Sequence, residues 1–491
     1  MTSEKIGIAG SLRARFNDPL RRSADALIIG TGLTSVLGLA FWALAARWLP
    51  TSAVGIGVAL MSTVALLANF ATLGMNNGLI RFLPAAGSGT ARIIMSCYAF
   101  CAGAAMFAAG IFLLGQPLWA EKLGFLRDSP VAMLAFVVGT AIWVLYVLQD
   151  QVLIGLRRTG WVPIQNGLAS VFKIALLPLF AGAATWAIFT ATMIPALLAV
   201  LLITALALRY ARQAAARDSR PAKETRVPIS SIVRFAASDH LATMLWFATN
   251  DVMTLIVLQV AGAEASAYWY IANAIGESLY LIVSNVGSVL IAESVHDPAH
   301  ATAYARRALL HGAQLVVPAA ILGIVFAPFV LRLMGPHYAE NATSTLQFIL
   351  ASAIPHLIVG ISVSTARVRG NMRAVVGVYA FISISTWVGG WYALHTWGLA
   401  GIGLAILMIH SVTAVFLLVT GRTGLWDNER GWRSFVDGAG RLHRSRRTKR
   451  KLERTGHSSL TALNACGVPK ARGTNWPKPW PNTIATAGER Q

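Results

Sequence analysis

The chain has 491 residues, of which 56% are hydrophobic and only 12% are charged, and its mean hydropathy is +0.60. A soluble domain carries roughly 25% charged residues, so this composition excludes a soluble protein and indicates one that crosses a membrane several times. The formal net charge is +21. Because membrane topology accounts for where these charges lie along the chain, we expect no nucleic-acid partner.

Apolar segments long enough to cross a bilayer, about 20 residues each, recur along the chain. Six precede a polar connector and six follow it, at 24–46, 54–75, 91–115, 131–154, 164–182, 185–208, 238–260, 266–291, 308–332, 343–364, 374–394 and 398–420. The sequence therefore predicts an all-α polytopic membrane protein with about twelve transmembrane helices. We divide it into a cytoplasmic N-terminal segment, a first lobe, a basic cytoplasmic connector, a second lobe and a basic tail expected to be largely disordered: 1–23, 24–208, 209–237, 238–420 and 421–491.

The distribution of basic residues predicts the orientation in the membrane. With both termini in the cytoplasm, the termini and the even-numbered connections hold 36 of the 41 Lys and Arg residues. The odd-numbered connections hold only Arg47, Lys122, Arg127 and Arg332. Because Lys and Arg are retained on the cytoplasmic side of a membrane, this asymmetry predicts cytoplasmic N- and C-termini and twelve crossings.

Charged side chains within the predicted helices are the candidate functional residues, because a charge in the membrane is costly and is usually kept for a role. Lys173 lies near the middle of the fifth segment, Asp251 follows Asn250 in the seventh, and Glu277 is central in the eighth. Asp150 lies toward the cytoplasmic end of the fourth. A lysine in one lobe and carboxylates in the other form the charge layout expected for moving an anionic substrate against H⁺ or Na⁺.

Two other interpretations of these residues stay open. Lys173 and Asp150 differ in depth by roughly 9 Å, within reach of an ion pair between extended side chains. Asp251 and Glu277 are equally well explained as buried, hydrogen-bonded groups without a coupling role. No zinc motif, nucleotide-binding loop or nucleophile elbow occurs in the sequence, so we expect a protein that is not an enzyme and has no cofactor beyond a coupling ion.

Two stretches carry a family resemblance. Residues 41–84 contain A-A-R-x-L-P at the end of the first helix, V-G at the start of the second, and then L-G and R-F-L-P. Residues 150–160 read DQVLIGLRRTG at the end of the fourth helix. Over about the first 180 residues the chain resembles the polysaccharide-biosynthesis flippases of the multidrug/oligosaccharidyl-lipid/polysaccharide (MOP) exporter superfamily.

The resemblance implies a MATE-like fold of two pseudo-symmetric six-helix lobes around a cavity that opens alternately to each side of the bacterial inner membrane. It implies a polyprenyl-diphosphate-linked oligosaccharide as substrate, contact with membrane lipids, and a polysaccharide polymerase or glycosyltransferases as partners. The implied substrate-binding residues are Lys173, Arg81 and Asn250, and the implied ion-coupling residues are Asp251, Glu277 and Asp150. One departure is that Lys173 is the only deep cation, whereas a strongly anionic substrate favours several.

Three competing functions follow from the same observations. A multidrug exporter of the same fold would be favoured by carboxylates in the first lobe, where only Asp25 and Asp150 occur, both near a helix end. A lipid II flippase usually has fourteen helices, two more than the sequence predicts. A membrane glycosyltransferase or polymerase needs a sizeable loop with catalytic side chains, and the predicted loops are short.

Overall fold

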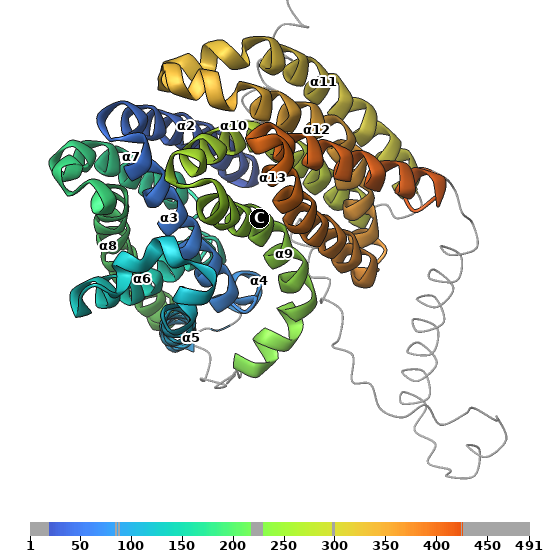
Figure 1. Ribbon diagram of the computed structural model, residues 1–491. Coiled ribbons are helices and arrows are strands. Elements are labelled where there is room, and N and C mark those ends of the chain that lie inside the picture. Colours follow the sequence, from blue (N-terminus) through green and yellow to red (C-terminus); the bar gives the residue numbers. More distant parts are fainter. Residues whose placement is uncertain are drawn as a thin grey trace, which may run out of the picture. The chain divides into compact units, whose positions relative to one another are not determined.

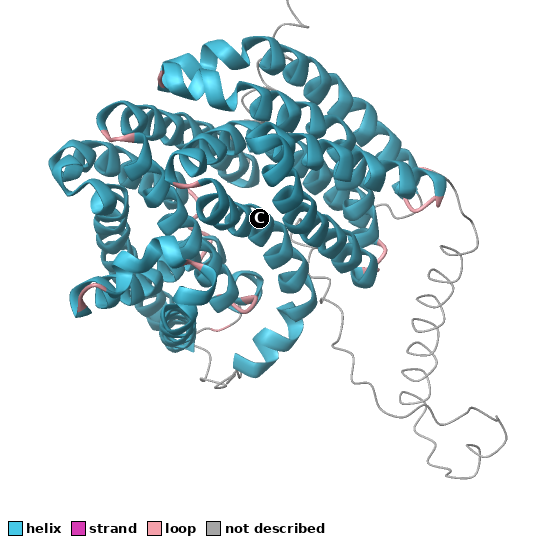
Figure 2. Cartoon of the chain, in the orientation of Figure 1, coloured by secondary structure: helices cyan, strands magenta, loops and turns pink. Residues whose placement is uncertain are grey.

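The computed structural model describes residues 19–83, 86, 89–217, 229–296, 300–423 and 425. Most of the predicted N-terminal segment, part of the connector and nearly all of the basic tail lie outside these residues. The described residues form only helices, turns and short loops, without strands (Figures 1 and 2). The α-helices are α2 (Pro19–Trp48), α3 (Thr51–Ala71), α4 (Met75–Phe82), α5 (Thr90–Trp119), α6 (Pro130–Gly155), α7 (Trp161–Phe180), α8 (Ala187–Arg217), α9 (Ile229–Ala261), α10 (Ala263–His296), α11 (Ala301–Met334), α12 (Pro336–Val368) and α13 (Met372–Val419).

The twelve predicted segments are found in eleven of these helices. Ten helices in the described part of the chain are long and apolar enough to cross a membrane. One of them, α13, contains the last two predicted segments, and the first predicted segment lies within α2, which has 30 residues. The prediction of an all-helical membrane protein with about twelve spans is therefore confirmed.

The predicted C-terminal boundary of the second segment was wrong. We expected a helix over 54–75, but α3 ends at Ala71 and the short helix α4 begins at Met75. Between them the backbone turns through Leu73 and Gly74, with φ angles of +44° and +79°. A right-handed helix cannot continue through left-handed residues, and glycine adopts this conformation without steric strain. Apolar residues continue across this turn, so hydropathy alone did not predict that the helix ends here.

Helix α13 consists of two helical segments joined at Gly398. Gly398 has φ +63° and ψ −153°, a combination that is not helical and is restricted almost entirely to glycine. The break separates the predicted segments 374–394 and 398–420. The two segments of α13 therefore run in opposite directions, so that its first and last residues lie at the same end of the bundle. Arg373 and Arg422 line one groove there.

The two halves of the described chain repeat one pattern of helix pairing (Figure 1). In the first half α3 and α5 both pack on α6, and α2 packs on α7. In the second half α10 and α11 both pack on α12, and α9 packs on α13. These pairs are each six spans apart, which is the repetition expected of two pseudo-symmetric six-helix lobes.

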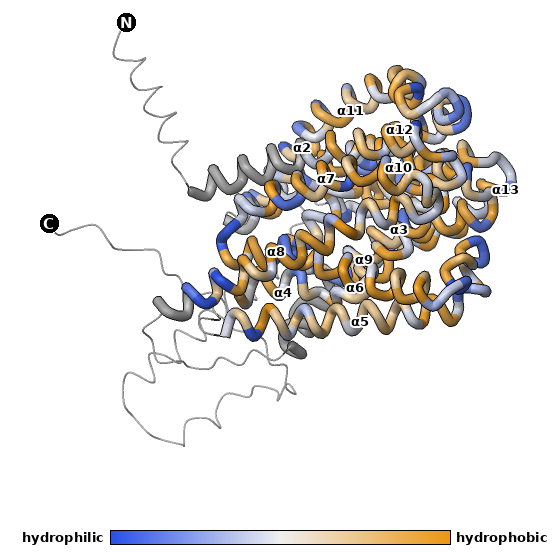
Figure 3. The backbone as a smooth tube through the Cα atoms, turned by 90° about the vertical axis from the view of Figure 1, so that its left-hand side faces the viewer, coloured by the Kyte–Doolittle hydropathy of each residue, from blue (hydrophilic) through white to orange (hydrophobic). Residues whose placement is uncertain are grey.

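The surface of the bundle is apolar along the helices. Figure 3 shows hydrophobic residues along the helices and hydrophilic residues concentrated at their ends. Large apolar side chains face outward in both halves, including Leu114 at 83% exposure and Phe329 at 62%. Such a surface is stable against lipid chains, and backbone polar groups are satisfied within each helix. The protein is thus a multi-pass membrane protein by both fold and surface.

Helix α3 joins the two halves. It packs against α9 and α10 of the second half, and one buried core contains Leu60 of α3 together with Ile271 and Ala272 of α10. Gly55 lies so close to the start of α10 that an added Cβ would stand 1.6 Å from the carbonyl oxygen of Ala263. Only glycine permits this backbone approach.

Candidate functional site

Two of the predicted coupling residues meet where α3, α9 and α10 pack together. Asp251 of α9 and Glu277 of α10 are close enough to interact electrostatically, and the phenol of Tyr270 lies near both carboxyl groups. The Ser62 hydroxyl of α3 donates a hydrogen bond to Asp251. Two carboxyl groups in an apolar bundle repel each other unless a proton or cation is shared between them. The arrangement is suited to binding a cation at the junction of the two halves.

Glu277 is held by two amide side chains. The Asn250 side-chain amide donates to Oε1 of Glu277, and Asn273, one turn earlier on α10, also donates to this carboxylate. Asn250, predicted as a substrate-binding residue, therefore positions Glu277 in this structure. Hydrogen bonds to a carboxylate stabilise its charged form and fix its orientation. The two amides therefore fix the orientation of the Glu277 carboxylate.

A cavity of about 680 Å³ lies directly beside Glu277. It is bounded by α2 from the first half and by α9, α10, α12 and α13 from the second. This volume falls within the range of small-molecule binding sites, about 300–1,000 Å³. Glu277 is the only carboxylate among the described residues that line it. Glu277, but not Asp251, thus borders a space large enough for a small-molecule group.

Aromatic rings form one wall of the cavity. Trp246 of α9 lies over His356 of α12, with ring centroids 5.0 Å apart and planes 23° apart. Tyr280 and Tyr379 contact the same indole at centroid distances of 5.9 Å and 5.5 Å. Trp42 lines the cavity from α2. Rings arranged in this way bind the apolar face of a sugar or an organic cation.

Hydroxyl groups form a second wall. Ser284 and Ser288 are exposed on α10 and, being four residues apart, share one face of the helix. Thr243 and Ser364 line the cavity from α9 and α12. Hydroxyls both donate and accept hydrogen bonds and therefore suit a neutral polar ligand such as a carbohydrate.

The cavity extends from the middle of the bundle toward the end that the charge distribution predicts to be cytoplasmic. Along α10 its lining runs from Ala274 to Ile291, about 26 Å at helical rise. Along α12 it runs from His356 to Arg367. Arg367 is a cation at the predicted cytoplasmic mouth, and its guanidinium carbon stands 5.9 Å from the Tyr379 ring centroid.

At the opposite end several contacts join the two halves, among them the following three. Gly55 approaches the Ala263 carbonyl, and the Arg47 Nε donates to the Leu333 carbonyl at 2.9 Å. The backbone N–H of Lys122 donates to Oε1 of Gln259 at 3.3 Å. Each contact pairs the first half with the second. The described residues therefore close the predicted outer end and leave a cavity in the inner half.

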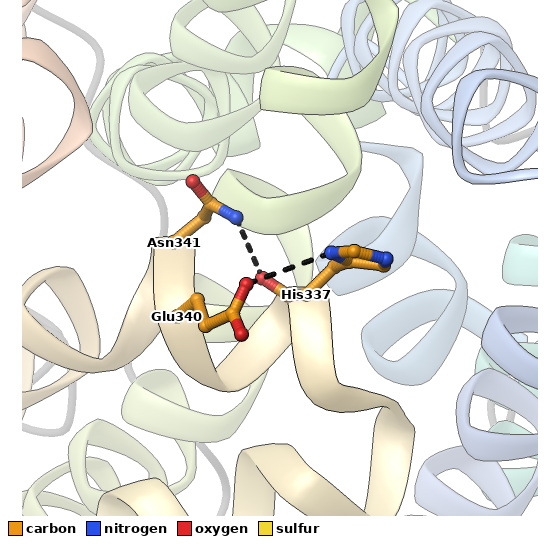
Figure 4. A network of polar contacts seen from close by, with 3 residues as sticks. All are labelled: His337, Glu340 and Asn341. Carbon is orange, nitrogen blue, oxygen red and sulfur yellow. Dashed lines mark hydrogen bonds and ion pairs between the residues drawn. The ribbon is translucent and has the colours of Figure 1, made fainter.

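A smaller pocket, about 380 Å³, lies at this outer end beside Arg47, Arg332 and His337. Figure 4 shows the adjoining first turn of α12, where the Asn341 side chain donates to the His337 carbonyl at 2.8 Å. The His337 Nδ1 lies 3.6 Å from Oε2 of Glu340 (Figure 4). The Glu340 carboxylate therefore contacts a residue of its own helix, α12.

Lys173 does not reach the cavity in this structure. It lies on α7, and its Nζ stands 4.6 Å from the ring centroid of Phe41 on α2. In the described part of the chain no ion pair joins Lys173 to Asp150, so the proposed pairing is absent. Phe41 directly precedes Trp42, which does line the cavity. Lys173 on α7 therefore contacts the residue of α2 that directly precedes the aromatic wall.

Asp150 belongs to a separate polar cluster in the first half. It accepts hydrogen bonds from the side chains of Gln165 and Asn166 on α7. The Tyr146 hydroxyl donates to Oδ1 of Asn166 at 2.7 Å. Asp150 thus ties α6 to α7, and the structure does not bring it to Asp251 and Glu277.

Sequence reasoning missed most of the cavity wall. Trp246, Tyr280 and His356 are single aromatic residues within apolar segments, where nothing in the pattern separates them from packing residues. Arg367 was counted among the cytoplasmic charges rather than as a cavity residue. Arg81, predicted to lie at the inner mouth, falls in α4, but its side chain is outside the described residues.

These features define the fold. A membrane bundle of two pseudo-symmetric halves, closed at one end and with a cavity between them at the other, is the MATE-like architecture that the sequence resemblance implied. No protein-family model matches the sequence, and a search of curated proteins finds no match.

Solved structures show this fold directly. The chain is similar to a multidrug resistance MATE family transporter of the MOP superfamily in its inward-facing conformation, with a TM-score of 0.61, 15% identity, and coverage of 80% of this chain and 94% of that one. It is similar to the lipid II flippase MurJ in an inward closed conformation, with a TM-score of 0.60, 13% identity, and coverage of 80% and 87%. A mutant of the Vibrio cholerae MATE transporter VcmN gives a TM-score of 0.56 at 15% identity, with coverage of 83% and 96%. At these identities the likeness establishes the fold.

Proposed function

We propose that this protein is a MOP-superfamily transporter that flips a polyprenyl-diphosphate-linked oligosaccharide from the inner to the outer leaflet of the bacterial cytoplasmic membrane. The observation that carries the proposal is the cavity between the halves, which combines aromatic rings, hydroxyl groups and one arginine at its mouth. Its fold is shared with transporters and with a flippase. Polysaccharide polymerases and glycosyltransferases are the proposed partners that consume or supply the lipid-linked glycan.

Each part of the substrate has a suitable partner in the cavity. The sugar rings stack on Trp246 and Trp42, and their hydroxyls hydrogen-bond to the Ser284 hydroxyl and donate to the hydroxyl oxygen of Ser288, which itself donates to the Ser284 carbonyl at 3.0 Å. The diphosphate stays at the cytoplasmic mouth beside Arg367, because a guanidinium binds phosphate oxygens in a bidentate manner. The polyprenyl chain remains in the lipid. This placement shifts the principal cationic role from Lys173 to Arg367.

Lys173 and Arg81 remain proposed as additional contacts for the diphosphate. Lys173 rests on an aromatic ring rather than on a carboxylate, so its charge is not neutralised by a neighbouring acid in the described chain. A rotation of α2 that moves Trp42 also moves Phe41, the ring on which Lys173 rests. Movement of α2 would therefore couple substrate binding at Trp42 to the position of Lys173.

Coupling to H⁺ or Na⁺ is assigned to Glu277 and Asp251. A cation entering from the outer side neutralises the pair and allows α9 and α10 to separate from Ser62 on α3. Loss of the cation to the cytoplasm restores the contacts between the halves. Asp150 is proposed as a secondary coupling residue, acting through the α6–α7 contact.

Transport in sealed vesicles tests this function. Purified protein is reconstituted with a fluorescent polyprenyl-diphosphate oligosaccharide, and a membrane-impermeant quencher reports the leaflet. We expect flipping that depends on an ion gradient and falls at least tenfold in Trp246→Ala and Arg367→Gln. The matched controls are Trp161→Ala and Arg212→Gln, which lie outside the cavity and should transport normally. Absence of flipping by folded wild-type protein across several glycans contradicts the proposal.

A second function is favoured by one specific observation. Trp246, Tyr280 and Tyr379 gather next to a single carboxylate, Glu277, and rings with a carboxylate also bind organic cations. A multidrug antiporter would use this same cavity. Gradient-driven efflux of a cationic dye that is lost in Trp246→Ala, without glycan flipping, would identify it. Competition between dye and glycan for one site would show which ligand binds more tightly.

A further inference from the structure

A second groove lies on the outside of the second half, away from the cavity. It has a volume of about 440 Å³ and is lined by the C-terminal end of α12 and by both segments of α13. Figure 1 shows these two helices side by side. None of the residues discussed above for transport lines this groove.

The walls of the groove are apolar and exposed. Phe381, Val412 and Phe416 line it and are 49%, 54% and 53% exposed. Its floor is closed by the buried side chains of Val363 and Val375. A groove of this kind on a membrane-facing surface is filled by an apolar chain. The groove extends about 12 Å along α13, from residue 373 to residue 381.

The polar groups along the walls are already satisfied. The Ser362 hydroxyl donates to the Ile358 carbonyl at 2.7 Å, and the Thr413 hydroxyl donates to the Ile409 carbonyl at 2.7 Å. Neither hydroxyl therefore requires a polar partner from the ligand. The middle of the occupant is accordingly apolar.

Two arginines mark one end of the groove. Arg373 lies in the first turn of α13 and Arg422 follows its last turn, and both line the groove. The Arg422 guanidinium carbon stands 5.8 Å from the ring centroid of Phe416. No carboxylate is among the described residues that line this groove. This end carries two positive charges, and it lies at the predicted cytoplasmic face, where anionic lipid head groups occur.

We propose that this groove binds one anionic phospholipid of the inner leaflet, with its phosphate between Arg373 and Arg422 and an acyl chain along Phe381, Val412 and Phe416. Charge complementarity selects the head group, because two guanidinium groups match phosphate oxygens. The apolar walls select a lipid over a soluble anion. The site is separate from the transport cavity and does not depend on the proposed substrate.

Binding is measured by titrating the full-length protein in detergent with phosphatidylglycerol or phosphatidylcholine and counting bound lipids by native mass spectrometry. We expect wild type to retain phosphatidylglycerol in preference to phosphatidylcholine. Removing each arginine, as Arg373→Gln or Arg422→Gln, should weaken the phosphatidylglycerol affinity about fivefold. Arg212→Gln, an exposed arginine of α8 outside the groove, is the matched control and should bind as wild type.

A steric variant separates the groove from general charge effects. A Cβ added at Gly377, which lines the groove, would meet no atom within 4 Å. Gly377→Leu therefore adds its Cβ without a clash, occupies part of the groove and leaves the charge unchanged, and it should abolish retention of the lipid. Gly103→Leu on α5, where a Cβ likewise meets nothing, is the control.

Two kinds of result would overturn the proposal. Equal binding of both lipids by wild type, or unchanged phosphatidylglycerol binding in the Arg373→Gln/Arg422→Gln double variant, overturns the anionic-lipid assignment. Loss of a dimer rather than of lipid in Gly377→Leu would assign the groove to a second copy of the chain and likewise overturn it. Unfolding midpoints of all variants in detergent confirm that each is folded before its lipid binding is compared.

Discussion

Substituting Gly55 by alanine should shift the balance between the two states of the transporter. An added Cβ would stand 1.6 Å from the Ala263 carbonyl oxygen, whereas real Cβ atoms essentially never approach closer than 3.0 Å. The start of α10 must therefore move away from α3 by 1.4 Å or more, the difference between these two distances. Neither atom can move by itself, because the Cβ is fixed by the backbone of α3 and the carbonyl oxygen belongs to the backbone at the start of α10.

The free-energy consequence follows from overpacking. Inserting a methyl group into a tight contact costs about 1–3 kcal/mol, and the contact joins the halves only where the outer end is closed. The alanine variant therefore destabilises the closed outer end relative to an open one. A difference of this size changes the ratio of the two states by roughly 5- to 150-fold.

Distance measurements between spin labels would detect the shift. Labels at Trp48 and Ala261, exposed positions at the outer ends of α2 and α9, report the separation of the halves by electron double resonance. We expect Gly55→Ala to increase the population with a longer distance. Gly103→Ala, where the added Cβ meets nothing within 4 Å, should leave the distribution unchanged.

Unchanged distances in a Gly55→Ala protein with a wild-type unfolding midpoint would refute the reasoning. Such a result would mean that α10 yields locally and that this contact does not control the outer end. A lowered unfolding midpoint together with unchanged distances would give the contact a purely structural role. Both measurements are made on the same labelled protein.

The remaining predictions concern ion coupling, the turn in α13 and the half-buried Lys173. Glu277→Gln should retain substrate binding but lose the dependence of transport on the ion gradient, because an amide cannot exchange a cation; gradient-dependent flipping at wild-type levels would argue against its role. Gly398→Ala should destabilise the protein by about 1–3 kcal/mol, since φ +63° with ψ −153° is almost restricted to glycine; the midpoint of thermal unfolding in detergent measures this, with Gly377→Ala as a control that should not be destabilised. Lys173→Met should preserve folding, because it keeps an apolar contact with Phe41 and removes a half-buried charge, but should slow flipping of the anionic lipid; equal flipping rates would remove Lys173 from the substrate path.

The sequence determined the elements and their depths in the membrane. Segment length and hydropathy predicted every span, because a bilayer requires about 20 apolar residues per crossing. Helical rise also places Asp251 and Glu277 at comparable depths on either side of the Gly262 turn, about 17 Å and about 23 Å from it. The left-handed turn at Leu73 and Gly74 was missed, since hydropathy carries no information about φ.

Only the tertiary structure decided which side chains meet. Depth along a helix does not specify which neighbour a residue faces, since that depends on the rotation of each helix and on its packing partners. Lys173 and Asp150 have compatible depths, yet Lys173 faces Phe41 and Asp150 faces Gln165 and Asn166. Trp246 and His356 are 110 positions apart in the chain and become neighbours only when α9 packs in the second half. The cavity therefore belongs to the packing of five helices, and no single segment of the sequence encodes it.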